Sequence, residues 1–315
     1  MSTEVIFEIQ QGPYWDWRVA LDLFLGGAGA GALVFAIYLD EIHNGKHRHV
    51  CNTAAWLSPI LIAGGLLLLM SKMGRPFDIF LSYTNFNPLA PLWWGGIIQP
   101  LLVLGSLLYA IKWHHPAPQE FGRKWLGRLL APLAVIVGAY HGFLLSVMVS
   151  RPLWNTGSTV VTALLGFVST GIAIVMLAHL VRMKLGGHDD ADRLAHLLSD
   201  IRDVRTILGV VLALQLGTLF LWWQSLIMGS LQDQEALAVA NDLYGALFWL
   251  VGIGLGVVIP LLLGFSNIIF RKTNHLRFEI TMIGLSSILI LVGGYVFRLS
   301  VLLAGQGAMP FTIDL

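Results

Sequence analysis

Long apolar segments alternate with short polar segments along almost the whole chain. A helix that crosses a membrane needs about 20 mostly apolar residues. Eight segments reach that length, and they occupy residues 18–40, 53–72, 92–113, 127–150, 157–183, 204–229, 243–268 and 279–304. The pattern therefore predicts an all-α integral membrane protein with eight transmembrane helices.

The positively charged residues divide unevenly between the two sides that these spans define. Of the 19 Lys and Arg residues, 14 lie in or beside the loops that follow the first, third, fifth and seventh spans. Cytoplasmic loops carry an excess of Lys and Arg, so these loops are predicted to face the cytoplasm. Because the number of spans is even, both termini are predicted on the outer, periplasmic face of a bacterial or archaeal cytoplasmic (inner) membrane.

The composition is typical of a membrane protein and excludes several kinds of cysteine-dependent site. The mean hydropathy is +0.75 and charged residues make up 12% of the sequence, whereas soluble domains have about 25%. The first 17 residues lack a basic region and a small-residue cleavage site, so we expect no cleavable signal peptide. The single cysteine, Cys51, excludes an internal disulfide, a CxxCH haem site and a cysteine-ligated iron–sulfur cluster within this protein.

The spans are expected to divide into two halves. We predict a first four-helix bundle over residues 18–150 and a second over residues 151–304, flanked by a periplasmic N-terminal segment (1–17) and a periplasmic C-terminal tail (305–315). The loop between the halves, residues 182–205, places leucines and an isoleucine at helical spacing and predicts a short interfacial helix. Glu279, near the start of the last span, is expected to be solvated.

The first span is the strongest candidate for a functional element. An acid, Asp22, lies about one turn inside its apolar run, and Gly26, Gly27, Gly29 and Gly31 follow. A carboxylate at membrane depth costs roughly 2.5–3.5 kcal/mol on insertion scales and normally faces a bundle interior or a water-filled cavity. Glycines at this density let neighbouring backbones approach closely. An acid on such a closely packed helix indicates a binding or proton-transfer site.

The histidines do not predict a haem or a metal site. Of the ten histidines, only His141 and His179 lie within spans. At 1.5 Å per residue they are about 15 Å and about 33 Å below the outer surface, too far apart to be the two axial ligands of one haem. The loop pairs His114–His115 and His47–His49 lack helical i, i+4 spacing within each pair, so no metal site is predicted.

Polar residues gather instead in the outer half of the spans. Asp22, Tyr140 and His141 are groups that can transfer protons or donate hydrogen bonds, as the carbonyl oxygens of a quinone require. Other polar residues lie at the outer ends of the helices: Arg75, Asp78, Arg151 and Arg298. Two interpretations stay open at this point, a quinone site or a structural pairing of Asp22 with an arginine. Most tryptophans near this face fit an interfacial aromatic belt.

Three sequence elements resemble the NrfD/PsrC family, the membrane subunits of polysulfide reductase and related respiratory complexes. They are W-x4-DLFLGGAGAG in the first span, GRPFD…NP…WWG between the second and third, and YHGFLLS…RPLW at the end of the fourth. The resemblance covers nearly the whole sequence. It implies two four-helix bundles, no haem, and a menaquinone or ubiquinone site near the outer face.

The resemblance also implies roles for single residues. Tyr140 matches the family's quinone-site tyrosine, Asp22 stands where polysulfide reductase has a histidine, and Val19 stands where it has an asparagine. The hydrogen bond that Val19 cannot make is expected from His141. The partner implied is a ferredoxin-like subunit with four [4Fe–4S] clusters, docked on the periplasmic face and connected to a molybdopterin catalytic subunit.

From these observations we predict a quinone-reactive membrane anchor with no redox cofactor of its own. The predicted proton-handling residues are Asp22, His141 and Tyr140. The predicted quinone-binding residues are Trp17, Arg18, Asp22, Tyr140, His141, Trp94 and Arg151. The predicted partner-docking residues are Arg75, Asp78, Asn85 and Asn87. The alternative is a proton channel or secondary transporter that uses the same intramembrane Asp, His, Tyr and Arg residues, although no matching pair of broken helices supports it.

Overall fold

The computed structural model describes residues 15–42, 47–73, 85, 87, 89–113, 120–185, 191–269 and 276–307. Nearly all of this described part is helical, and no strand occurs in it. The helices are α1 (Trp17–Ile42), α2 (Arg48–Lys72), α4 (Pro91–Lys112), α5 (Glu120–Ser146), α6 (Ser158–Leu185), α7 (Ala191–Ile227), α8 (Leu231–Gly245), the π-helical stretch η3 (Ala246–Val258), α9 (Ile259–Ile269) and α10 (Leu276–Gly307).

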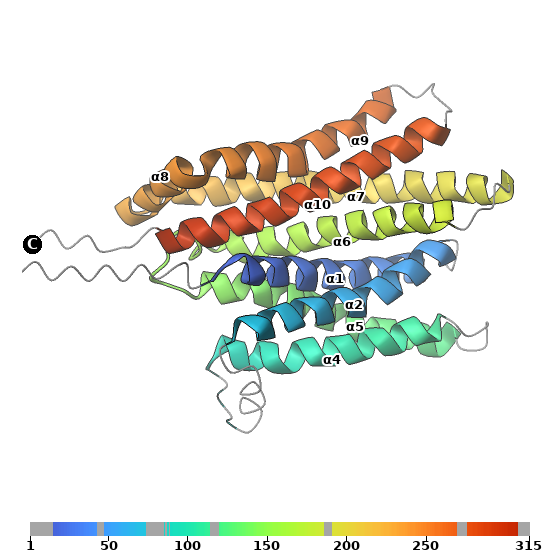
Figure 1. Cartoon of the computed structure of the whole chain (residues 1–315), viewed down its shortest axis with the longest axis horizontal. Helices are drawn as coiled ribbons and strands as arrows, with labels where there is room; N and C mark the ends of the chain where they lie inside the picture. Colours follow the sequence, from blue (N-terminus) through green and yellow to red (C-terminus); the bar gives the residue numbers. More distant parts are fainter. Residues whose placement is uncertain are drawn as a thin grey trace, which may run out of the picture.

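Eight helical segments in the described residues are long and apolar enough to cross a membrane. Since α8, η3 and α9 follow one another without a break, Leu231–Gly264 counts as one of the eight. The predicted all-α membrane architecture with eight spans is therefore confirmed. The helices lie side by side along the long axis of the molecule (Figure 1).

Helix α1 occupies the centre of this arrangement. It contacts α2, α5, α6 and α10, and Figure 1 shows it between α6 and α2. Helices α2 and α5 also contact α4, whereas α6 and α10 also contact α7. The residues of α1 are mostly buried, unlike those of a lipid-facing span. The separate two-bundle grouping and its domain boundaries stay predictions.

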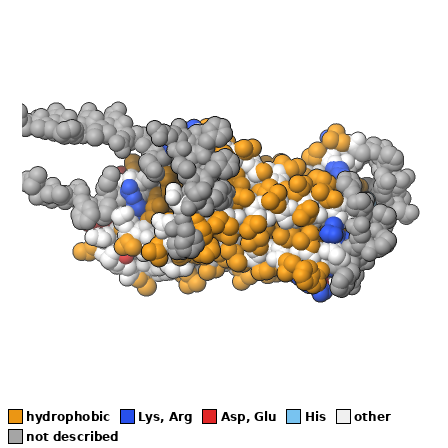
Figure 2. All heavy atoms as spheres, turned by 90° about the horizontal axis from the view of Figure 1, so that it is seen from below, with side chains coloured by type: hydrophobic (Ala, Val, Ile, Leu, Met, Phe, Trp, Pro, Cys, Tyr) orange, Lys and Arg blue, Asp and Glu red, His pale blue; other side chains and the backbone are white. Residues whose placement is uncertain are grey.

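Hydrophobic side chains cover the middle of the molecular surface on the face seen in Figure 2, and Lys and Arg lie towards its two ends. Leu67, Leu104 and Leu262 are examples of large apolar side chains that are 66%, 60% and 61% exposed. In water such a surface would be unfavourable, but lipid tails are as apolar as leucine. The exposed apolar belt is therefore the expected lipid contact.

The two ends of the described sequence meet at one end of the molecule. The backbone N–H of Trp15 donates to Oε1 of Gln306 at 2.8 Å, and Nε2 of Gln306 donates to the Trp15 carbonyl at 2.8 Å. The Trp15 ring also stacks on Trp154, with ring centroids 5.5 Å apart. An even number of spans brings both ends of the protein to the same side, and the periplasmic identity of that side stays a prediction.

Two helices extend further than the hydropathy pattern predicted. Helix α7 runs without interruption from Ala191 to Ile227, so the predicted separate interfacial helix is wrong. The sequence has no glycine or proline between residues 191 and 208, and nothing ends the helix before the span. On the other side, Ser230 and Asp233 form a capping box that starts α8 at Leu231.

Ion pairs join neighbouring helices at the end of the molecule opposite to Trp15. The Arg123 guanidinium donates to both carboxylate oxygens of Asp40, at 2.8 and 2.9 Å, and its carbon lies 4.0 Å from the Trp113 ring centroid. Glu279 is only 7% exposed and accepts a hydrogen bond from Arg205. The expectation that Glu279 is solvated is therefore wrong, because a neighbouring helix supplies its counter-charge.

Candidate functional site

Four buried polar side chains meet between α1, α2, α4 and α5, and we call them the polar cluster. They are Asp22 of α1, Gln99 of α4, and Tyr140 and His141 of α5, which are 4%, 5%, 9% and 2% exposed. The Tyr140 and His141 rings are 5.7 Å apart between centroids, and Asp22 and His141 both lie within 4.0 Å of the position that a Cβ atom on Gly26 would take. The structure thus brings together the three residues that were predicted to handle protons.

Three glycines make room for these side chains. A Cβ atom on Gly26 would lie 3.3 Å from both Cε1 and Nε2 of His141 and 4.0 Å from Oδ1 of Asp22. A Cβ atom on Gly65 of α2 would lie 2.8 Å from Oδ1 of Asp22. On α4, a Cβ atom on Gly95 would lie only 2.2 Å from the Tyr140 hydroxyl oxygen. Each polar group therefore lies directly on the backbone of a neighbouring helix.

Hydrogen bonds hold the His141 ring in place. Its Nδ1 is 2.8 Å from the Val137 carbonyl oxygen, and its Nε2 is 3.3 Å from Nε2 of Gln99. Because a carbonyl only accepts, Nδ1 carries a proton, and Nε2 of the neutral ring then accepts from the Gln99 amide. The ring also makes an edge contact with Phe167, at 5.5 Å between centroids. His141 therefore links α5 to both α4 and α6.

Asp22 differs from Asp40 and Glu279, the other buried acids in the described part of the protein, because no described side chain hydrogen-bonds to it. Of the described arginines in the half of the molecule that contains Asp22, Arg18 pairs with Asp16, whereas Arg151 and Arg298 donate to backbone carbonyls. In the described part of the protein, no arginine therefore pairs with Asp22. The interpretation of Asp22 as one half of a structural ion pair has no support there.

Trp17, Trp94 and Arg151, which were also predicted to bind the quinone, are not part of the polar cluster. Trp17 is 53% exposed and Trp94 is 48% exposed. Arg151 donates to the carbonyls of Gly305 and Gln306 at the end of α10, at 3.3 and 3.0 Å, and not to the polar cluster. The predicted roles of these residues in quinone binding stay predictions.

Arg18 takes part in a charged clamp at the start of α1. Asp16 precedes the helix and accepts hydrogen bonds from the Arg18 backbone N–H, the Arg18 guanidinium and Lys72 of α2, at 2.8 to 3.1 Å. Burial of the carboxylate acts in the opposite direction, but these hydrogen bonds lower the pKa of Asp16 to about 2. The clamp joins the start of α1 to the end of α2.

Of the predicted partner-docking residues, only Asn85 and Asn87 lie in the described part of the sequence, and both are exposed. Arg75 and Asp78 lie outside the described residues. An exposed position is what docking requires, and the docking role itself stays a prediction for all four.

Four residues of this site were not predicted from the sequence in their specific roles: Gln99 and the three glycines at positions 26, 65 and 95. Gln99 could have been found by the argument used for Asp22, since an amide in the middle of a span is also unfavourable in lipid. For Gly65 and Gly95, nothing in the sequence states which partner side chain they face. That information comes only from the packing of α2 and α4.

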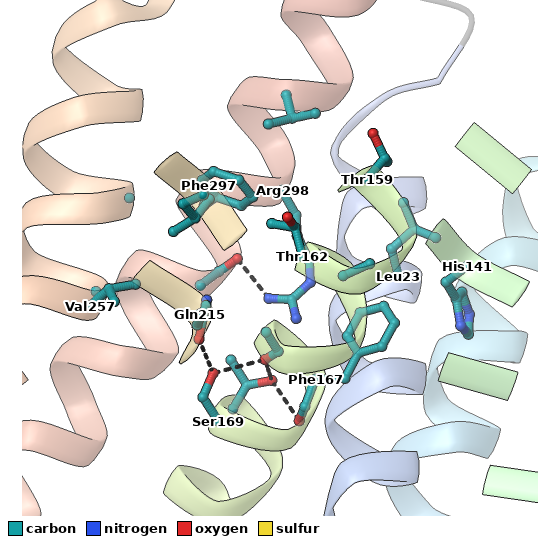
Figure 3. Close-up of a pocket in the computed structure, with 18 of the residues that line it drawn as sticks. Leu23, His141, Thr159, Thr162, Phe167, Ser169, Gln215, Val257, Phe297 and Arg298 are labelled. Atoms are coloured by element: carbon teal, nitrogen blue, oxygen red, sulfur yellow. Dashed lines mark hydrogen bonds between the residues drawn. The ribbon is translucent and has the colours of Figure 1, made fainter. Parts of the chain in front are cut away.

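A cavity of about 70 Å³ lies on the other side of His141, towards α6, α7, η3 and α10. Leu23 and His141 line it from one side and Gln215 and Arg298 from the other (Figure 3). This volume has room for several water molecules, since one water needs about 10–15 Å³ on the same measure. His141 therefore belongs both to the polar cluster and to the lining of this cavity.

The protein resembles known membrane proteins over nearly its whole length. The family model described as "Polysulphide reductase, NrfD" matches residues 5–310. The sequence is 25% identical to the protein NrfD of Escherichia coli (strain K12), over 93% of this protein and 95% of that relative. It is 27% identical to the C subunit of polysulfide reductase from Wolinella succinogenes, over 93% and 94% of the two proteins. A NrfD homolog of Haemophilus influenzae is 26% identical over 93% and 94%.

Proposed function

The protein belongs to the NrfD (polysulphide reductase) family of bacterial inner-membrane proteins, and from this premise we propose that it is the quinone-reactive subunit of a respiratory oxidoreductase complex. Members of this family are generally membrane anchors of redox complexes. The proposal adds that this anchor exchanges electrons between a menaquinone or ubiquinone pool and a partner subunit.

The observation that carries the proposal is Asp22 beside Tyr140 and His141, with no hydrogen-bonding partner among the described side chains. A quinone head group has two carbonyl oxygens, and each needs a hydrogen-bond donor or a proton-transferring group. The phenol of Tyr140 can donate, the carboxyl group of Asp22 can exchange a proton, and Nε2 of His141, which accepts from Gln99, can take up a proton. A purely structural cluster would pair its acid, because an unpaired buried carboxylate is destabilising.

Each side chain has a distinct part in the proposed reaction. Oxidation of a quinol releases two protons and two electrons, and reduction of a quinone takes up the same number. Asp22 and His141 accept or supply the protons, and Tyr140 hydrogen-bonds the head group. Gln99 positions the His141 ring through its amide, and Trp17 and Trp94 provide aromatic walls. The same residues serve both directions, since the proton transfers are then reversed.

The electrons need a partner, because a protein with one cysteine cannot hold a cysteine-ligated iron–sulfur cluster. The relative from Wolinella succinogenes is named as one component of polysulfide reductase, and that name implies further subunits. We assign the docking of a four-cluster [4Fe–4S] subunit to the segment with Arg75, Asp78, Asn85 and Asn87. That subunit in turn connects to a molybdopterin catalytic subunit.

The direct test is binding of a fluorescent quinol analogue to the purified complex, measured by fluorescence quenching. Tyr140→Phe removes one hydrogen bond and should raise the dissociation constant by about tenfold, which equals about 1.4 kcal/mol. Asp22→Asn removes a charge-assisted contact and should raise it by about tenfold to a hundredfold.

The other end of the same helices offers matched controls. Asp40 and Tyr109 are also a buried aspartate on α1 and a buried tyrosine, and Tyr109 donates to Asp40 at 3.2 Å. Tyr109→Phe should leave the dissociation constant unchanged, because this pair lies at the opposite end of the spans. Unchanged binding in both Asp22→Asn and Tyr140→Phe would exclude the proposed site.

A further inference from the structure

A positive charge lies beside the cavity described above, without a counter-charge among the described residues. The Arg298 guanidinium donates from Nη1 to the Gly294 carbonyl of its own helix at 2.8 Å. Its Nη2 is buried and has no hydrogen-bond partner in the described part of the protein, and no described carboxylate pairs with it. Its carbon lies 4.9 Å from the Phe167 ring centroid and 5.3 Å from that of Phe24, and cation–π contacts compensate such a charge only in part.

Other hydrogen-bond donors converge on the same space. A Cβ atom on Gly166 would lie 3.4 Å from Nη2 of Arg298 and 3.5 Å from Nε2 of Gln215. Oε1 of Gln215 already accepts from Ser169 at 2.8 Å, so its amide N–H groups remain for another partner. The Thr162 hydroxyl also lines the cavity and has no partner among the described residues. Figure 3 shows Arg298, Thr162 and Gln215 around this space.

The chemistry of this cavity is that of an anion site. Arg298, Gln215 and Thr162 present N–H and O–H donors and a permanent positive charge. Most of the remaining lining is apolar, as with Leu219, Val257 and Val301, and its other polar residues are His141, Thr159, Ser169 and Thr170. A buried charge needs a counter-charge or full hydrogen bonding. One guanidinium balances one negative charge, and an apolar wall favours a weakly hydrated anion over sulfate or phosphate.

We propose that the cavity between α6, α7, η3 and α10 binds one small monovalent anion, such as chloride, through Arg298, Gln215 and Thr162. The cavity shares only His141 with the polar cluster, and the anion site does not depend on the proposed quinone chemistry. Arg298 is nine residues before Gly307, so it is about 14 Å from the end of α10 at 1.5 Å per residue.

The experiment is a thermal-stability titration of the purified protein in detergent. The protein starts in gluconate buffer, and chloride, bromide, nitrate or sulfate is then added at constant ionic strength. A ligand that binds only the folded state raises the melting temperature with a saturable dependence on its concentration. We expect chloride, bromide and nitrate to produce this rise and sulfate to produce none.

Three variants decide whether the effect belongs to this cavity. Arg298→Gln removes the positive charge, and Gln215→Glu supplies a carboxylate beside Arg298, so both should abolish the halide dependence. Gln215→Glu should also raise the melting temperature in gluconate, which a misfolded variant would not do. Arg182→Gln alters an exposed arginine that donates to Asn52 and should keep the wild-type response. A halide effect that persists in Arg298→Gln, or its absence from wild type, would overturn the proposal.

Discussion

At the scale of single residues, the site depends on glycines, which leave space for the polar side chains of neighbouring helices. Asp22 and Tyr140 each lie against a glycine of a neighbouring helix, Gly65 and Gly95 respectively. A methyl group at either position would occupy the space of a polar atom. Buried cores tolerate such insertions poorly, because they force side chains from their preferred rotamers.

Gly65→Ala should therefore weaken quinol-analogue binding by about tenfold while the protein still folds. The added Cβ would lie 2.8 Å from Oδ1 of Asp22 and 3.2 Å from the Asp22 carbonyl oxygen, so the carboxylate must move. The neighbouring substitution Gly64→Ala is the control, since its Cβ would make an ordinary contact of 3.9 Å with Leu25. Equal affinities for the two variants would show that the position of Asp22 does not matter for binding.

The sequence predicted Asp22, Tyr140 and His141 because ionisable and aromatic polar groups are rare inside spans and can be found without a structure. It did not predict that Gln99 hydrogen-bonds to His141. Periodicity along one helix states which of its residues share a face, but not which residue of another helix lies opposite. Contacts between α4 and α5 depend on the packing of the whole molecule.

At the scale of helices, the glycines of α1 explain its central position. A Cβ atom on Gly29 would lie 2.9 Å from the Ser58 carbonyl oxygen of α2, and one on Gly31 would lie 2.1 Å from the Phe167 carbonyl oxygen of α6. Opposite Gly31, a Cβ atom on Gly171 would lie 2.5 Å from the backbone of α1. The close-packing prediction for this helix is confirmed, and the glycines face different neighbours.

We predict that Gly31→Ala destabilises the protein by about 1–3 kcal/mol, the usual range for overpacking. The clash is with the backbone of α6, which cannot rotate away as a side chain can. Gly217→Ala on α7 is the control, because no described atom other than its own helix backbone lies within 4 Å of its added Cβ. The melting temperature in detergent should fall for Gly31→Ala only. An unchanged value would contradict the contact between α1 and α6.

The clamp at Asp16 gives a prediction about pH. The pKa of Asp16 is about 2 in the folded protein, below its ordinary value of 3.8. A lowered folded-state pKa stabilises the protein above pH 3.8, and this stabilisation is lost as the pH falls towards 2. Asp16→Asn should lower the melting temperature at pH 7, and its difference from wild type should shrink between about pH 5 and about pH 3. A difference independent of pH would contradict the clamp.

Helix boundaries were harder to predict than helices. Hydropathy placed the sixth span at 204–229 and the seventh at 243–268, but α7 begins at Ala191 and α8 begins at Leu231. The helical residues that precede these two predicted spans are mostly polar, so the hydropathy pattern does not detect them. Their helical state follows from the capping box at Ser230 and from the absence of glycine and proline between residues 191 and 208.

At the scale of the whole molecule, two kinds of polar site lie on the two sides of His141. Among the described residues, the polar cluster contains an acid without a partner, and the cavity beyond Phe167 contains an arginine without a counter-ion. Asp22 and Arg298 are thus not a pair, and no ion pair within the described part of the protein joins these two sites. This separation allows one site to handle a quinone and the other an anion.

Photolabelling of the purified complex with an azidoquinone, followed by peptide mapping, would locate the quinone site directly. We expect label in residues 17–26 of α1, 91–99 of α4 or 137–141 of α5, and less label in Asp22→Asn. Label on α7, η3 or α10, around Arg298, would contradict the proposed site and place the quinone in the cavity on the other side of His141.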